Sequence, residues 1–452
     1  MDKFFSPIIG LEIHIELKTA SKMFCGCSAN HFGKKPNTQV CPICLGLPGA
    51  LPAPNKKAID WTVLAGLALG CQIPKFSKFD RKNYFYPDLP KGYQISQYDL
   101  PLGINGKLEL KVSNQSRNEK NIKSKIIRIR RVHLEEDTAK MIHYQNFTLL
   151  DFNRAGVPLI EIVTEPDFES SDEVKEFLVK LQQIVRWIGI AEANMEKGQM
   201  RCEPTVNLKI KKGKKIFYTP LVELKNINSF RFVKKAIEYE VKRQLEEFEK
   251  TGEVKREGNK TTRGWDEKKG ITVLQREKEE AADYRYFPEP DIPPIRWRKI
   301  QITNFKLQIL ELPEVKREKF IKEYGLTDYQ AKILTSKKEM ADYFEKVVKL
   351  GRGKLEISYL ANFIINKKVE ISRISPNQLI RNLLEKEKIT KITGGELEKI
   401  ILEALKENQK ATEDYKKGKV NAVQFLIGQV MAKTKGQAKP EEIKEKLVEL
   451  IS

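Results

Sequence analysis

The sequence predicts an α/β (α+β) domain with a largely antiparallel sheet, followed by an all-α region. Segments in which apolar and polar residues alternate, the pattern of half-buried strands, gather in the first 160 residues. Residues 297–452 instead carry apolar residues at helical spacing among many lysines and glutamates. Prolines between Pro288 and Pro294 mark the change of composition. A chain of 452 residues exceeds the size of one core, so we expect two or three domains.

The chain is strongly basic, with 82 Lys and Arg against 61 Asp and Glu and a formal net charge of +21. This excess favours a polyanionic partner, and RNA is the polyanion that fits best. A thermophile's Lys- and Glu-rich surface would explain many charges, but not the excess of one sign. No apolar run is long enough to cross a membrane and the N-terminus has no signal-peptide core, so we expect a cytoplasmic protein.

Residues 10–17 alternate with a period of two and form the first predicted strand. Its apolar side chains fall on one face, whereas Glu12, His14 and Glu16 fall on the other. Two carboxylates and an imidazole on one side of a rigid strand can begin a site for a hard metal ion, or an acid/base pair. A solvated sheet face with a chance histidine is the alternative interpretation.

Two close pairs of cysteines flank a loop rich in Gly, Pro, Asn and Ser, which predicts a four-thiolate zinc site. The ligands would be Cys25, Cys27, Cys41 and Cys44. Thiolates would fill all four tetrahedral positions and select zinc over magnesium, so the site would be structural. Cys71 and Cys202 stand alone, and we interpret them as ordinary buried thiols.

The remaining predicted elements follow the same two periods. Helical spacing predicts helices at 56–69, at 171–188 with Ser171 as its N-cap, and from 230 to about 250. Alternation predicts strands at 107–110, 126–129 and 147–152. Breaks near Gly325, Gly351 and Pro376 divide the helical region.

Three segments interleave basic, aromatic and turn-forming residues, and we interpret them as loops: 79–97, 262–266 and 283–291. Such a composition suits a loop that stacks on bases and neutralises phosphates. For residues 79–97, an aromatic-rich loop packed against its own domain explains the composition equally well.

A second acidic group, Glu135-Glu136-Asp137, follows His133 at the end of a predicted strand. Alone, this group could be a solvated run of charges. Set beside Glu12 and His14, it completes an oxygen-rich ligand set for Mg²⁺.

Together these motifs resemble GatB, the B subunit of the tRNA-dependent amidotransferase GatCAB. The matching stretches follow the family's order and span nearly the whole chain. They are residues 10–17, 21–25, 79–97, 133–140, 151–167, 200–207, 223–230, 283–294 and 414–436.

The resemblance implies three domains. A cradle-like catalytic domain with the zinc-binding loop would cover residues 1–294, a helical domain 295–372 and a YqeY-like tail 373–452. The tail is shortened between Leu384 and Leu397, where the family has an extra pair of helices.

The resemblance also implies a reaction that depends on ATP and Mg²⁺. Glu-tRNA(Gln) would become Gln-tRNA(Gln), Asp-tRNA(Asn) would become Asn-tRNA(Asn), or both. ATP would phosphorylate the aminoacyl carboxylate, and ammonia from an amidase, GatA, would then amidate it, in a heterotrimer with the small protein GatC. The sequence has no P-loop and no glutaminase nucleophile motif, so ATP must bind differently and this chain alone should not use glutamine.

By similarity, Glu12, His14 and Glu136 would hold Mg²⁺, and Glu135 would orient the substrate or accept a proton. Four further positions match the same pocket: Lys82, Tyr84, Arg201 and Glu203, the last where the family usually has Asp. Two other interpretations compete. A zinc-stapled RNA-binding protein without catalysis leaves the acids and histidine unexplained, and a magnesium-dependent phosphohydrolase of small molecules leaves the basic excess and helical tail unused.

Overall fold

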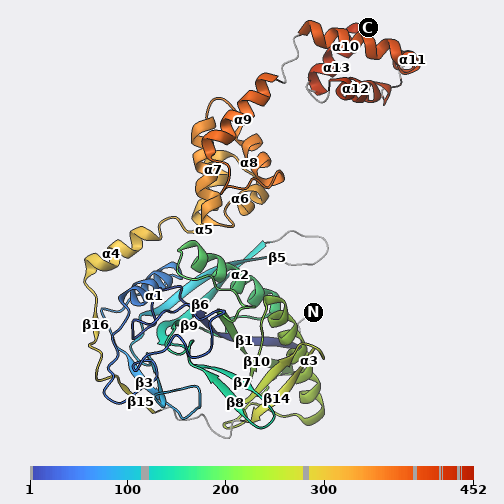
Figure 1. Cartoon of the computed structure of the whole chain (residues 1–452). Coiled ribbons are helices and arrows are strands. Elements are labelled where there is room, and N and C mark those ends of the chain that lie inside the picture. The colour runs from blue at the N-terminus through green and yellow to red at the C-terminus, as the bar shows by residue number, and fades with distance from the viewer. Residues whose placement is uncertain are drawn as a thin grey trace. The chain divides into compact units, whose positions relative to one another are not determined.

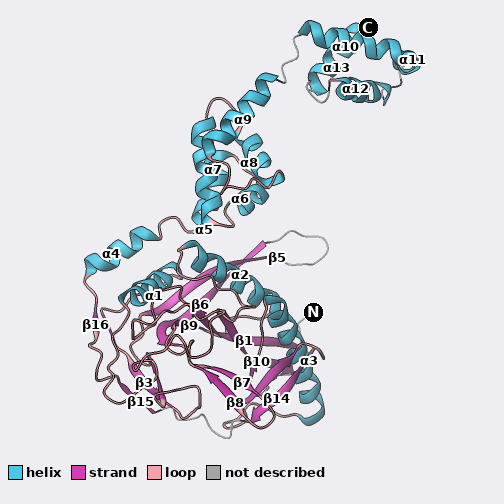
Figure 2. Ribbon diagram, viewed as in Figure 1, coloured by secondary structure: helices cyan, strands magenta, loops and turns pink. Residues whose placement is uncertain are grey.

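The structure is a computed structural model that describes the chain except for residues 1–3, 114–121, 278–284, 390–393, 417–418, 420, 435–437, 439 and 452. The chain forms two compact units, Met1–Lys316 and Arg317–Ser452. The first unit contains the sheets and the second is helical (Figure 2), which confirms the predicted fold class. The three predicted domain boundaries stay predictions. Among the described residues, no helix has both the length and the apolar character needed to cross a membrane.

The described part of the first unit is built on a nine-stranded sheet (Figure 1). Eight of its strands follow the order β14-β13-β12-β10-β1-β9-β6-β5, and the ninth, β11, pairs with β10. Its strands are β1 (Phe5–Glu16), β5 (Gly103–Ser113), β6 (Ile122–Glu136), β9 (Pro158–Thr164), β10 (Met200–Lys212), β11 (Lys215–Tyr218), β12 (Val222–Lys225), β13 (Thr261–Asp266) and β14 (Ile271–Glu277). The pairs are antiparallel, apart from β12 with β13. The central strand β1 is the strand predicted at 10–17, extended towards the N-terminus.

The apolar face of β1 packs into the main hydrophobic core. Ile9, Ile13 and Ile15 are fully buried in a core that includes residues of three helices. These helices are α1 (Lys56–Ala68), α2 (Ser171–Trp187) and α3 (Phe230–Thr251). They match the helices predicted from apolar spacing. The N-cap of α2 is Ser170 rather than the predicted Ser171, because the Ser170 hydroxyl accepts the backbone N–H of Glu173.

Small β-structures replace the loops predicted from aromatic composition. A three-stranded sheet has the order β15-β3-β4, with β3 (Asp80–Asn83), β4 (Tyr93–Ser96) and β15 (Arg285–Pro288). Residues 262–266 belong to β13, so that segment is not a loop; residues 283 and 284 lie outside the described residues. Two strand pairs complete the unit: β2 (Phe76–Ser77) with β16 (Ile295–Arg296), and β7 (Lys140–His143) with β8 (Thr148–Asp151). Basic and aromatic residues thus form strands here, and β3 carries polar residues on both of its faces.

The helical region begins with α4 (Lys299–Gln308) and α5 (Pro313–Tyr324). The following helices are α6 (Asp328–Leu334), α7 (Lys338–Gly351), α8 (Ile357–Asn366), α9 (Pro376–Ile389), α10 (Gly394–Glu407), α11 (Gln409–Lys416), α12 (Asn421–Lys433) and α13 (Pro440–Ile451). The predicted breaks are confirmed: Gly325 follows α5 with a φ of +65°, Gly351 ends α7 and Pro376 begins α9. In the last four helices a separate small core forms around residues such as Leu426 and Val430.

Candidate active site

The polar face of the large sheet carries one row of ionisable side chains across four strands. In register across β6, β9, β1 and β10 lie His133, Glu161, His14 and Arg201. Alternate residues of a strand share a face, so Glu12 lies on the same face as His14, and Glu135 on the same face as His133. The sheet therefore gathers groups that are far apart in sequence.

These side chains converge on the carboxylate of Glu161. His133 Nε2 lies 2.9 Å and His14 Nε2 lies 3.4 Å from Glu161 Oε2. His14 Nε2 also lies 3.8 Å from Glu12 and 3.7 Å from Glu135. Two overlapping groups could each hold a metal ion, because within each group the ligand atoms lie within 4.8 Å of one another. One group is Glu12, His14 and Glu161, and the other is His133, Glu135 and Glu161. The carboxylate oxygens suit Mg²⁺ or Mn²⁺, and a neutral imidazole nitrogen could add a further ligand.

The carboxylates dominate the electrostatics of this cluster. Burial opposes protonation of His14, but Glu161 and Glu135 outweigh it and raise its pKa to about 9. The pKa of His133 is likewise raised to about 9, against the effect of burial, by Glu161 and Glu135. Although burial acts against it, the two imidazoles hold the pKa of Glu161 well below its usual range. The carboxylates of the cluster therefore stabilise positive charge on both imidazoles.

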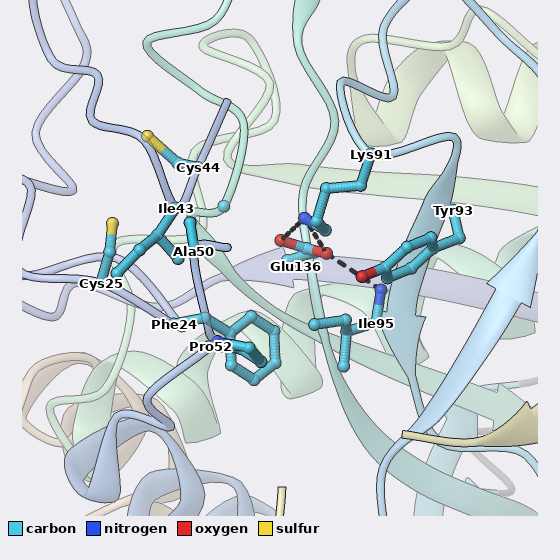
Figure 3. A pocket seen from close by; sticks show the side chains of 11 residues that line it. Phe24, Cys25, Ile43, Cys44, Ala50, Pro52, Lys91, Tyr93, Ile95 and Glu136 are labelled. Carbon is cyan, nitrogen blue, oxygen red and sulfur yellow. Dashed lines mark hydrogen bonds and ion pairs between the residues drawn. The ribbon is translucent and has the colours of Figure 1, made fainter. Parts of the chain in front are cut away.

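Glu136 does not join this cluster, which differs from the predicted ligand set. It follows Glu135 directly, and consecutive residues of a strand point to opposite faces. Its carboxylate lies 2.6 Å from Lys91 Nζ and accepts the backbone N–H of Ile95. Figure 3 shows this pair facing a pocket whose opposite wall includes Cys25. Of the two adjacent glutamates, only Glu135 faces His14.

The small sheet brings Lys82 towards the cluster, and Tyr84 follows directly after β3. Ser96 of β4 donates a hydrogen bond from its hydroxyl to Glu135, so this sheet lies against the polar face. Burial opposes protonation of Lys82, but Glu135 and other nearby groups raise its pKa above the usual range. The Lys82 ammonium lies 5.7 Å from the centre of the Tyr84 ring. Lys82 thus lies near Glu135, and its role in the predicted pocket stays a prediction.

Arg201 and Glu203 lie on the same face but have their own partners. Arg201 donates to Asp137 over 3.0 Å, although it lies opposite His14 in the register. Glu203 lies opposite Glu12 and forms an ion pair of 2.8 Å with Lys225. Both residues therefore border the cluster.

The sequence interpretation missed Glu161, the residue on which the cluster converges. Glu161 is 4% exposed and stands between Ile160 and Ile162 in a strand whose other residues are apolar except for Thr164 at its end. A single acid inside such a strand is itself a signal, because an unpaired buried carboxylate is costly. Its partners, however, become visible only when the strands are placed side by side.

The four predicted zinc ligands do converge. The Sγ atoms of Cys25, Cys27, Cys41 and Cys44 lie within 4.8 Å of one another. Lys22 is fully buried beside them, and its ammonium donates to Gln39 O over 2.7 Å, Phe152 O over 3.2 Å and Cys44 Sγ over 3.6 Å. A hydrogen bond from Cys25 lowers the pKa of Cys44 to about 4. Clustered thiols beside a buried cation fit a tetrathiolate metal centre.

The fold and site together define an α/β domain with a sheet face lined by acids and histidines, and a helical region follows it in the chain. A family model described as the GatB/GatE catalytic domain matches residues 7–303, and one described as the GatB domain matches residues 358–451. The chain belongs to the GatB family. The resemblance predicted from the motifs is therefore confirmed.

Relatives named as the B subunit of aspartyl/glutamyl-tRNA(Asn/Gln) amidotransferase match nearly the whole chain. The protein of Caldicellulosiruptor saccharolyticus is 46% identical over 492 residues, which cover 98% of each chain. That of Thermotoga maritima is 42% identical over 496 residues, covering 98% of this chain and 99% of the relative. Both matches are longer than the 452 residues of this chain, so these relatives carry insertions. We expect these insertions between the positions of Leu384 and Leu397, where the tail of this chain is predicted to be shortened.

Proposed function

We propose that this chain is the subunit of a glutamine-dependent amidotransferase that converts Glu-tRNA(Gln) to Gln-tRNA(Gln), Asp-tRNA(Asn) to Asn-tRNA(Asn), or both. It would work in the cytoplasm with the amidase GatA, the small protein GatC and the misacylated tRNA. The names of relatives 42–46% identical over almost the whole chain support this proposal. The observation that carries the chemistry is the convergence of Glu12, His14 and Glu161 on one sheet face.

The reaction requires that a poor electrophile be activated. A carboxylate repels nucleophiles, and oxide is not a viable leaving group. Attack of a carboxylate oxygen on the ATP γ-phosphorus forms an acyl phosphate and releases ADP. Ammonia then attacks the carbonyl carbon, phosphate leaves, and a base takes the extra proton. The second step uses a good leaving group, so ATP makes amidation possible.

The described residues fit the first step of this reaction. Glu12 and Glu161 would hold Mg²⁺, with Glu161 in place of the predicted Glu136, and His14 would join them by giving up its proton when the metal binds. Mg²⁺ bound there would neutralise phosphate oxygens. Lys82 would add a second positive charge near the phosphate oxygens. This charge would help to bind ATP in a chain that has no P-loop.

Glu135 fits the second step. Its carboxylate accepts a hydrogen bond from Ser96 and lies 3.7 Å from His14 Nε2, within the cluster. We propose that it accepts the proton that ammonia loses on attack. The pair of imidazoles holds the pKa of Glu135 below its ordinary value, against the effect of burial, so the base is ionised before the reaction.

The complex with GatA and GatC tests this function. With ATP, Mg²⁺ and glutamine, the complex should amidate Glu-tRNA(Gln) or Asp-tRNA(Asn), and this chain alone should not use glutamine. His14→Ala should lose ADP formation but still bind tRNA, because His14 lies in the acidic cluster and not on a broad basic surface. Parallel assays with both misacylated tRNAs identify the substrates. ADP formation that persists unchanged in His14→Ala would contradict the proposed metal role.

A further inference from the structure

We infer that Arg131 binds the phosphoryl group that is transferred from ATP, an inference that rests on the proposed function. Arg131 lies on β6 two residues before His133, and its register opposite Val163 places it on the face of Glu12. Its Nη2 atom lies 3.9 Å from Glu161 Oε1. The side chain is 35% exposed, so it borders the cluster and remains accessible to a ligand.

The donors of Arg131 are used differently from those of its neighbours on the same strand. Arg128 donates two side-chain hydrogen bonds to Asp167, and Arg130 donates two to Glu165. The Nε atom of Arg131, by contrast, is buried and has no hydrogen-bond partner in the part of the chain that the structure describes. A separation of 3.9 Å from Glu161 is also too long for a hydrogen bond. Arg131 therefore brings to the edge of the cluster a guanidinium whose Nε is unpaired among the described residues and whose Nη2 makes only a long ion pair with Glu161.

A second cation reaches the same region from the small sheet. Tyr286 of β15 lies opposite Lys82 of β3 in the register. Burial raises the pKa of Tyr286 to about 12, and the charges of Glu161 and Glu135 act in the same direction. Lys82 and Arg131 both act in the opposite direction on this hydroxyl. Both cations are therefore close enough to the Tyr286 hydroxyl to affect its pKa.

Phosphoryl transfer explains why an arginine is needed here. In the transition state, the charge of the γ-phosphoryl group spreads over three oxygens, while the bond to the β-phosphate oxygen breaks and the bond to the carboxylate oxygen forms. A cluster of carboxylates would repel this group. A guanidinium offers parallel donors that match two phosphoryl oxygens, which a lysine cannot do. Arg131 would thus add its positive charge and its donors to the neutralisation of the phosphoryl oxygens.

The test compares Arg131→Met and Arg131→Lys with the matched control Arg130→Met in the full complex with GatA and GatC. ADP formation with Glu-tRNA, ATP and Mg²⁺ gives kcat and the KM for ATP. We expect Arg131→Met to lower kcat about a hundredfold and Arg131→Lys to recover only part of it. Arg130→Met should behave like the unmodified protein, because Arg130 pairs with Glu165 outside the cluster.

Two further measurements separate phosphoryl binding from a structural role. Binding of Mn²⁺ alone and the melting temperature should be unchanged in Arg131→Met. Added guanidinium should restore part of the activity of Arg131→Ala. Arg131→Met activity within threefold of the unmodified complex, or a parallel loss of Mn²⁺ binding, would overturn the role of Arg131. If the unmodified complex forms no ADP with either misacylated tRNA, the proposed function itself fails.

Discussion

Glu161→Gln should lower ADP formation by the assembled complex at least about a hundredfold, which is among the largest effects expected of a single substitution in this chain. The amide has nearly the same shape but no negative charge. Both imidazoles and both potential ligand groups converge on this carboxylate, so the change weakens the contacts with both histidines and removes a charged ligand from each group. The measurement is single-turnover ADP formation with misacylated tRNA.

Glu165→Gln is the matched control. Glu165 comes directly after β9, the strand that carries Glu161, but it pairs with Arg130 rather than with the histidines. We expect its ADP formation to stay within about threefold of the unmodified complex, as for other surface ion pairs. A melting temperature for each variant shows whether lost activity reflects lost folding. If Glu161→Gln keeps its fold and its activity, the cluster is not the phosphoryl-transfer site.

Cys41→Ser should remove the bound zinc and lower the melting temperature by about 5 °C or more. The cysteine loop has few buried apolar residues, so we expect the metal to replace the core that the loop lacks. Metal analysis of the purified chain should find about one zinc ion in the unmodified protein and much less in the variant. Cys202→Ala should keep its zinc, because Cys202 lies in β10 and outside the four-thiol cluster.

Lys22→Met offers a second test that keeps all four thiols. Zinc with four thiolates carries a net charge of about −2, and buried charge requires a partner. The ammonium of Lys22 lies 3.6 Å from Cys44 Sγ, so its removal should speed the release of zinc to a chelator. Stability and metal content that are unchanged in both Cys41→Ser and Lys22→Met would show that the cysteines do not hold a structural metal.

Periodicity alone predicted the parts of the site that lie within one strand. The alternation of residues 10–17 places Glu12 and His14 on one face, and the structure has them there. Alternation could not choose between Glu135 and Glu136, because the sequence does not show which face of the strand around His133 lies beside Glu12 and His14. Only the pairing of β6 with β9 decides that Glu135 faces the cluster.

Composition predicted less well where strands carry polar residues on both faces. Residues 79–97 contain β3 and β4, and their lysines and tyrosines concealed the alternation that identifies a strand. Helices were easier, and α2 is the clearest case, because it buries an apolar stripe from Val174 to Val185. Glu161 was missed for a different reason. Its role depends on His14 and His133, which are more than a hundred residues apart in sequence.

The most direct measurement of the central claim is the binding of Mn²⁺ to the purified chain, followed by electron paramagnetic resonance. The account predicts that Glu161→Gln binds Mn²⁺ at least about tenfold more weakly than the unmodified chain. Glu136→Gln should bind it as tightly as before, because Glu136 pairs with Lys91 outside the cluster. The reverse pattern, with binding lost in Glu136→Gln and kept in Glu161→Gln, would contradict the site described here.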